Sequence, residues 1–164
     1  MEIELCGYKV LIDPEDYEKI VNYNWRIIKR KDSVVYFHTA VYDAQLYREK
    51  KIKSKTVLLH RLIMNCSYKD GKMIDHINRN TLDCRKINLR FATNSQNQWN
   101  RKTQKRNVTK LKGVMFDKRR GKYYSRIVHD KKAVFLGYFT DMYLAHEAYC
   151  IASVKYHGAY GRVE

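Results

Sequence analysis

The sequence predicts an α+β protein with two domains, and two arrangements of strands and helices indicate this. In the first, two short strand-like runs flank a polar loop between residues 72 and 93, and a polar helix follows from about Asn94. In the second, three strand-like runs between residues 111 and 139 precede a single helix. We therefore expect one domain over residues 1–105 and a smaller one over residues 106–164.

The stretch before residue 72 predicts further strands and short helices. An N-terminal strand is followed by a helix, which Asp13 is placed to cap and in which Pro14 suits the first position. Strands are expected at residues 25–28 and 34–39, because apolar residues alternate or cluster there. The apolar run of residues 58–64 predicts the start of another helix.

Turn and capping residues divide the C-terminal part. Gly121 and the segment around Asp130 separate the three strands. Thr140 is the expected N-cap of the helix, and Gly158 is the expected residue just beyond its end. Between these two residues, small and apolar side chains recur at helical spacing, at Leu144, Ala145, Ala148, Ala152 and Tyr156.

Positive charge is concentrated in one short stretch of the chain. The 164 residues carry 33 Lys plus Arg against 17 Asp plus Glu, a formal net charge of +16, and residues 101–132 hold 13 basic and 2 acidic side chains, or +11. A block of one sign repels itself unless a polyanion binds it. Nucleic acid is the expected partner, because an anionic membrane would call for a basic amphipathic helix where strands are predicted.

Other function classes are excluded by composition. No apolar run is long enough to cross a membrane, and the acidic N-terminus does not resemble a signal peptide. The four cysteines lie far apart without a C-x-x-C pair, which disfavours zinc and disulfide frameworks and suggests reduced thiols. We expect a cytosolic protein with no membrane partner and no small-molecule cofactor.

One cluster of polar residues accompanies the strand–loop–strand–helix pattern. Asp75 and His76 end the first strand, Asn88 begins the second, and Asn97 falls on the helix. This order of elements brings the end of the first strand beside the first turns of the helix, where Asp75 and Asn97 could share a hard cation such as Mg²⁺. His76 projects from the opposite side of the strand to Asp75, which suits a general base that does not bind the metal.

These residues resemble the HNH nucleases, in particular the phage and intron-encoded homing endonucleases. The patterns D-H-x-x-x-N, N-L-R and T-x-x-x-N begin at Asp75, Asn88 and Thr93, and the upstream segment LLHRLIM looks like the HRL segment of those enzymes. The third position of the motif is Asn97, where the family name implies His. The resemblance implies a ββα-metal core over about residues 72–103. It also implies that the protein acts in the cytoplasm of a bacterial host cell, associated with the nucleoid through DNA.

The resemblance implies a metal-dependent endonuclease, of the homing type, that leaves 5′-phosphate and 3′-hydroxyl ends. His76 would activate water, Asn88 would brace the loop, and Asp75 and Asn97 would hold one Mg²⁺, for which Mn²⁺ would substitute. His60 either lies near the active site or is a core histidine, and the sequence leaves both open. The alternatives are a DNA-binding regulator with a vestigial nuclease unit and a basic RNA-binding protein of ribosomal type.

The C-terminal part resembles the DNA-binding domain of plant ethylene-response factors. The similar segments are GVMFDKRRGKYYSRI, FLGYFTD and LAHEAY, in the order three strands and one helix. The resemblance implies that the sheet enters the major groove of double-stranded DNA. Met115, Tyr123 and Arg126 depart from the plant pattern, so no base sequence carries over.

Alternation along the second C-terminal strand predicts which side chains face DNA. If Tyr123, Ser125 and Ile127 pack under the helix, their neighbours point to the duplex. The expected DNA-binding residues are Lys122, Tyr124 and Arg126 on this strand, with Arg119, Arg120, Lys131 and Lys132, joined by Lys118, as phosphate contacts in the turns. The oligomeric state stays open, with a monomer favoured.

Overall fold

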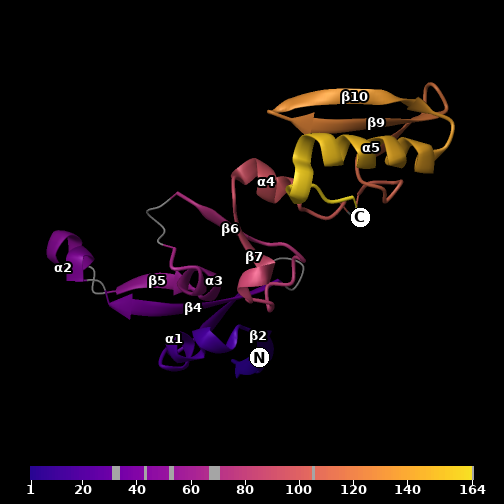
Figure 1. Cartoon of the computed structure of the whole chain (residues 1–164). Helices are drawn as coiled ribbons and strands as arrows, with labels where there is room; N and C mark the ends of the chain where they lie inside the picture. The colour runs from indigo at the N-terminus through magenta and orange to yellow at the C-terminus, as the bar shows by residue number, and fades with distance from the viewer. Residues whose placement is uncertain (31–33, 43, 52–53, 67–70, 105, 164) are drawn as a thin grey trace. The chain divides into compact units, whose positions relative to one another are not determined.

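The computed structural model describes residues 1–30, 34–42, 44–51, 54–66, 71–104 and 106–163. They fall into two compact units, Met1–Ala92 and Thr93–Glu164, which are described separately (Figure 1). Both mix small antiparallel sheets with a few helices, as the sequence predicts. Across the described ranges, no helix has the length and apolar character that crossing a membrane requires.

The first unit begins with a hairpin where the sequence predicts a single strand. β1 (Glu2–Leu5) and β2 (Tyr8–Leu11) pair antiparallel through a two-residue turn. Cys6 and Gly7 both adopt positive φ, 51° and 78°, which is the backbone that a tight hairpin turn requires. Cys-Gly is not one of the usual turn pairs, so the sequence did not indicate this turn. The predicted helix follows as η1 (Pro14–Asp16) and α1 (Tyr17–Val21).

A three-stranded sheet in the order β3–β4–β5 forms the middle of this unit. Its strands and the two neighbouring helices are β3 (Arg26–Lys29), β4 (Val35–Tyr42), α2 (Ala44–Lys50), β5 (Ser54–Leu58) and α3 (Leu59–Ile63). The predicted strands and the predicted start of α3 are confirmed, whereas α2 and β5 had no counterpart in the sequence analysis. Phe37, Leu59 and Ile63 are fully buried and lie in the main apolar core.

The unit ends with the strand pair that carries the candidate site. β6 (Met73–His76) pairs antiparallel with β7 (Leu89–Ala92), and η4 (Lys86–Asn88) leads into the second strand. Leu89 and Cys84 belong to the same core as the N-terminal strands. The loop between the two strands is therefore fixed against the body of the unit.

The second unit contains α4 and the predicted three-strand, one-helix domain. Its elements are α4 (Asn94–Trp99), β8 (Val114–Asp117), β9 (Lys122–His129), β10 (Lys132–Phe139), α5 (Met142–His157) and η5 (Gly158–Tyr160). The sheet has the order β10–β9–β8 and is antiparallel throughout. The division between the units precedes α4, whereas the sequence predicts a boundary after it, at Lys105, which lies outside the described residues.

Helix α5 lies along one face of this sheet (Figure 1). Ala145 and Ala152 of α5 are buried on the side of the helix that faces the sheet. Ser125 and Ile127 of β9 are buried on the sheet face below the helix, as alternation predicts. Gly113 adopts a φ of +77°, and a Cβ there would come within 2.0 Å of the Tyr149 ring, so only glycine fits.

The caps of α5 were predicted in part. Its N-cap is Asp141, whose carboxylate accepts hydrogen bonds from the backbone N–H groups of Tyr143 and Leu144. The prediction of Thr140 was therefore wrong by one residue, because a serine- or threonine-type cap and an aspartate cap stand side by side in the sequence. Gly158 ends the helix with a φ of 52°, as expected.

Candidate active site and nucleic-acid interface

His76 ends β6 in a buried cluster of aromatic and sulfur-containing side chains. Its ring lies edge-on to that of His60, with 5.2 Å between ring centroids, and 6.4 Å from that of Tyr36. The Sγ of Cys84 is 3.9 Å from His76 Nε2. His60 thus lies beside His76 and is itself buried, so both possibilities that the sequence leaves open for it agree with the structure.

Both imidazoles are neutral at pH 7. Burial lowers the pKa of His76 to about 4, although the negative charges of Asp75 and Asp83 act in the opposite direction. Burial, together with the nearby His76 and Arg61, lowers the pKa of His60 to about 3. A neutral imidazole can accept a proton, which is the state that a general base requires before catalysis.

Asp75 makes a different contact from that of the neighbouring His76, as expected for successive residues of a strand. Its Oδ2 accepts hydrogen bonds from Nη2 of Arg90 at 2.8 Å and from Nε at 3.0 Å. The two residues stand directly opposite each other on β6 and β7, and both side chains are largely buried. This charge-assisted pair fixes the carboxylate on the strand. The sequence analysis did not assign Arg90 a role, although antiparallel pairing of the two strands would have placed it there.

Asn88 ties the two ends of the β6–β7 loop together. Its side-chain Oδ1 accepts a hydrogen bond from the backbone N–H of Asn78 at 2.9 Å, and its Nδ2 donates to the carbonyl of Asp83 at 2.7 Å. The side chain of Asn88 is buried, and its bond to Asp83 is made away from water. Asn88 thus connects Asn78 and Asp83 across the loop, and the catalytic bracing role that the resemblance implies for it stays a prediction.

Asp83 is a second buried support of the loop, which the sequence analysis missed. Its carboxylate accepts two hydrogen bonds from Arg85, both 2.8 Å long, and one from Asn78 Nδ2 at 2.9 Å. The Arg85 bonds, opposed by burial, hold the pKa of Asp83 below its usual range. The spacing D-x-R in the sequence was the available signal for this pair.

The N-terminal segment clamps the same loop from outside. The carboxylate of Asp13 accepts a hydrogen bond from the backbone N–H of Lys86 at 2.7 Å, at the start of η4. The ammonium group of Lys86 contacts the carboxylates of Glu15 and Asp16. Asp13, predicted as the cap of its own helix, makes no side-chain cap bond there and instead caps η4.

Backbone hydrogen bonds complete this clamp. The N–H of Leu11 donates to the carbonyl of Leu82, and the N–H of Cys84 donates to the carbonyl of Leu11, both at 2.8 Å. The loop thus adds a short parallel bridge to the N-terminal hairpin. The first residues of the chain therefore help to hold the loop between His76 and Asn88.

Asn97 belongs to α4 in the second unit and is partly exposed. A capping box fixes the start of α4, because Thr93 accepts from the N–H of Gln96 and the Gln96 side chain accepts from the N–H of Thr93. Within the first unit, His60 packs on His76, Asp75 precedes His76 on β6, and Asn88 immediately precedes the residue that pairs with His76 on β7.

The two predicted metal ligands belong to different units. Among the residues that the structure describes, no group of three or more His, Cys, Asp or Glu side chains is arranged to hold a metal. The predicted ligands, Asp75 and Asn97, supply one carboxylate and one amide oxygen, which are the donor types that Mg²⁺ prefers. The carboxylate of Asp75 would bind the cation while also paired with Arg90. The positive charge of Arg90 weakens the attraction between this carboxylate and a further cation.

The sheet of the second unit has an open basic face. Lys122 and Arg126 are exposed on β9, with Tyr124 partly exposed between them. The predicted phosphate contacts, Lys118, Arg119, Arg120, Lys131 and Lys132, are all exposed at the two turns. The predicted alternation of buried and exposed side chains along β9 is thereby confirmed.

Two exposed aromatic residues of β10 enlarge this face, and the sequence analysis missed them. Phe135 and Tyr138 are 57% and 42% exposed and stand opposite Arg126 and Tyr124, respectively. Strict alternation would place them on opposite faces, but a bulge between Phe135 and Gly137 brings both to the same face. The guanidinium of Arg120 also lies over the Tyr138 ring.

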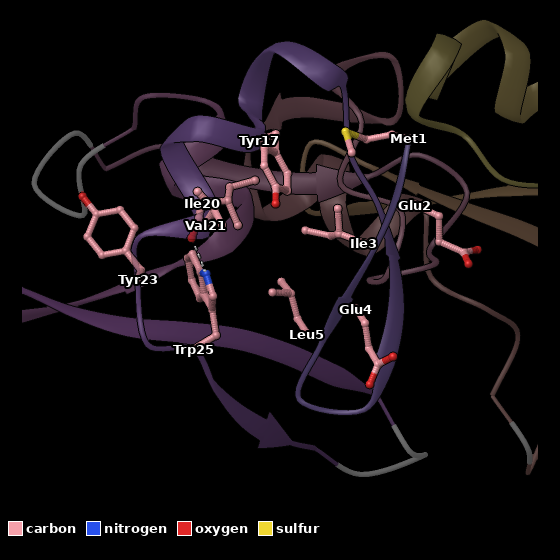
Figure 2. A pocket seen from close by; sticks show the side chains of 10 residues that line it. All are labelled: Met1, Glu2, Ile3, Glu4, Leu5, Tyr17, Ile20, Val21, Tyr23 and Trp25. Carbon is pink, nitrogen blue, oxygen red and sulfur yellow. Dashed lines mark hydrogen bonds between the residues drawn. The ribbon is translucent and has the colours of Figure 1, made fainter.

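A surface hollow of the first unit lies elsewhere (Figure 2). It is lined by residues of β1 and α1 and by Trp25, whose Nε1 donates a hydrogen bond to the carbonyl of Ile20 at 2.9 Å. None of the predicted site residues lines this hollow. It is therefore not the candidate active site.

Comparison with known families identifies the central segment. Residues 57–99 match the family described as HNH endonuclease, so this segment is an HNH endonuclease-like domain, which indicates a nuclease or DNA-binding role. The match includes His60, Asp75, His76, Asn88 and Asn97.

The chain is also similar to Protein 3.8 of Escherichia phage T7. The two are 39% identical over 62 residues, which are 38% of this chain and 51% of the phage protein. The chain therefore spans about half the length of this relative.

Proposed function

We propose that this protein is a metal-dependent DNA endonuclease of the HNH type, of the homing class, that hydrolyses a phosphodiester to 5′-phosphate and 3′-hydroxyl ends. The observation that carries the proposal is the neutral, buried His76 next to Asp75 at the end of β6, before a loop that Asn88 closes with two hydrogen bonds. Simple DNA binding does not require this combination of residues.

His76 is the proposed general base. Its neutral ring accepts the proton of the water that attacks the scissile phosphate. His60 and Tyr36 pack against the ring and limit its rotation. Asn88 keeps the loop after His76 in one conformation, so that the base is held in place before DNA binds.

Asp75 and Asn97 are the proposed holders of one divalent cation, Mg²⁺ or Mn²⁺. When bound, such a cation stabilises the negative charge that develops on the phosphate and on the leaving oxygen. Arg90 orients the Asp75 carboxylate through two hydrogen bonds. The Asn97 assignment rests on the T-x-x-x-N spacing and on the family match of residues 57–99.

The second unit is the proposed anchor on double-stranded DNA. The support is an exposed face with Lys122, Arg126 and three aromatic rings, bordered by two basic turns. The turn cations would contact phosphates, and the strand side chains would contact base edges. Similarity to a phage protein supports a role in a phage-infected bacterial cell.

A cleavage assay on supercoiled plasmid tests the proposal. The wild-type protein should convert the plasmid to nicked or linear DNA with Mg²⁺ or Mn²⁺ and should not do so in EDTA. The His76→Ala variant serves as the control for contaminating nuclease. Binding without cleavage under all metal conditions would instead favour the DNA-binding regulator with a vestigial nuclease unit.

A further inference from the structure

The C-terminal unit holds α4 by an aromatic stack. The indole of Trp99, the last residue of α4, lies parallel to the imidazole of His157 at the end of α5, with 4.1 Å between ring centroids and 11° between planes. His129 at the end of β9 stacks on the same indole at 6.1 Å. Two elements of the second unit therefore contact one side chain of α4.

His157 is itself fixed in place. Its Nε2 donates a hydrogen bond to the carbonyl of Val128 at 2.8 Å, and its side chain is buried. Burial lowers the pKa of His157, so the ring is neutral at pH 7 and stacks without the cost of burying a charge. The platform under Trp99 is thus part of the α5–β9 core.

The C-terminal end of α4 has a second attachment. The ammonium group of Lys112 donates to the carbonyl of Trp99 and, at 2.8 Å, to that of Arg101. A cation at this position satisfies carbonyls that a helix leaves without partners and interacts favourably with the helix dipole. The backbone carbonyl of Lys112 lies 3.0 Å from His146 Nδ1, which links the attachment to α5.

Asn97 precedes Trp99 by two residues on this short helix. Two residues correspond to a rotation of roughly 200° about the helix axis, so the two side chains leave opposite sides of α4. With the Trp99 side held by His157 and His129, the Asn97 side faces away from the stack. Any looseness of the stack would move Asn97 with the helix.

We infer that Trp99 is a positioning residue for the nuclease, which acts through Asn97 by holding α4 on the C-terminal unit. The inference rests on the proposed function. It makes the C-terminal unit part of the cutting machinery, because the unit carries the helix of the predicted ββα pattern in addition to the basic DNA-binding face. Removing the stack should therefore reduce cleavage without reducing DNA affinity.

The test compares Trp99→Ala with Trp99→Phe in the full-length protein, with plasmid DNA as substrate. At saturating DNA, Trp99→Ala should lower the cleavage rate by about 10²-fold, the loss that a misplacement of about 1 Å can cause, while the Kd for DNA changes less than twofold. Trp99→Phe keeps an aromatic ring in the stack and should recover most of the rate. Tyr143→Ala is the matched control, because it removes an exposed ring from the same unit.

A double-mutant cycle shows whether Trp99 acts through Asn97. If it does, Trp99→Ala should cause no further loss in an Asn97→Ala background, since the two changes remove the same contribution. Additive losses would overturn the inference and leave Trp99 with only a structural role.

Hydrogen exchange provides a readout that does not depend on activity. In the Trp99→Ala variant the amides of Asn97 and Asn100, which bond to Thr93 and Gln96 in α4, should lose protection while β9 keeps its own. Unchanged protection, or full cleavage with unprotected α4 amides, would overturn the inference. A wild-type protein that binds but never cuts would overturn the proposed function and, with it, the positioning role of Trp99 in cleavage. Hydrogen exchange alone would then decide whether the stack holds α4.

Discussion

The two units use their polar residues in opposite ways. In the first unit, Asp75, Asp83 and Asn88 are buried, and each is held by hydrogen bonds to neighbours in the sequence or across the strand pair. In the second unit, the Lys and Arg side chains of the turns and of β9 are exposed. Cutting DNA demands fixed geometry, whereas holding DNA demands accessible charge. Substitutions of the buried residues of the first unit and of the exposed cations of the second unit should therefore fail in different ways.

The largest effect is expected at His76. The His76→Ala variant should lose about 10²–10⁴-fold in cleavage rate, because the neutral imidazole is the proposed proton acceptor. DNA affinity should stay within a few-fold, since the basic face lies in the other unit. Single-turnover cleavage and a binding titration on the same DNA measure the two quantities.

His38→Ala is a suitable control, because it removes a partly exposed histidine of β4. Cleavage by His76→Ala at the wild-type rate would remove this residue from the mechanism. If His76→Ala also lost DNA affinity, cleavage and DNA binding would not depend on separate sets of residues.

The next largest effect concerns the stability of the first unit. Asp75→Ala leaves the largely buried guanidinium of Arg90 without its carboxylate, and breaking such a pair typically costs about 3–5 kcal/mol. Asp75→Asn keeps an oxygen that accepts from Arg90 but also removes the negative charge, so it should lose stability, though less than Asp75→Ala. Both variants should fail to cut at ordinary Mg²⁺ concentrations.

Urea unfolding followed by Trp25 fluorescence in a Trp99→Phe background reports on the first unit alone, since the chain has two tryptophans. An alanine variant as stable as the wild type would mean that the ion pair contributes little to folding. Cleavage by either variant in EDTA would count against the metal scheme.

The sequence predicted the elements that have local signals. The Asp13-Pro14 start, the strand ending at Asp75 and His76, and the turn at Gly121 all follow from side-chain chemistry within a few residues. The hairpin at Cys6 was missed because its turn pair is unusual. The position of Asp75 and Asn88 in the site came from spacing and from the family resemblance.

Contacts between distant residues could not be predicted in the same way. Asp13 and Lys86 lie far apart in the chain, and nothing local indicates that one caps the helix of the other. The bulge near Gly137, which turns Phe135 and Tyr138 to one face, depends on pairing with β9. Likewise, the assignment of α4 to the second unit depends on the stack of Trp99 on His157.

Acid should destabilise the first unit through His60 and His76. Their pKa values fall from about 6.5 in the unfolded chain to about 3 and 4 in the native state, so below pH 6.5 the unfolded chain binds more protons. The free energy of unfolding is then unaffected above pH 6.5 and falls as the pH drops from about 6 toward 4. Two protons give a slope of at most about 2.7 kcal/mol per pH unit.

Urea unfolding in metal-free buffer, again followed by Trp25 fluorescence, measures this slope. His60→Phe keeps a ring beside His76 but removes one titrating group, so the slope should fall by about half. A flat profile between pH 6 and 4.5 would mean that the two imidazoles are protonated in the native state as easily as in the unfolded chain.

A smaller effect is expected from the clamp on the loop. Asp13→Ala removes the acceptor for the Lys86 N–H and should destabilise the first unit by about 0.5–2 kcal/mol, as for other lost helix caps. The cleavage rate should fall moderately, because the loop that carries Asn88 loses one of its supports. Glu15→Ala is the matched control, since its exposed carboxylate contacts the same lysine. If both variants lose equal stability, the clamp depends on charge and not on the cap.

The smallest effect separates the two kinds of DNA contact in the second unit. Arg119→Ala with Arg120→Ala should weaken binding to all DNA sequences alike and reduce the slope of log K against log salt by up to about 1.8, at about 0.9 for each phosphate that is no longer neutralised. Arg120 is held by Asp117 and lies over Tyr138, so its share of that change should be the smaller one. Lys122→Ala with Arg126→Ala should instead reduce discrimination between sequences, because these side chains rise from the open face of β9. Binding titrations from about 50 to 200 mM salt, on a selected site and on random DNA, measure both quantities. Identical changes for the two pairs would mean that the open face reads no base and serves, like the turns, as a phosphate anchor.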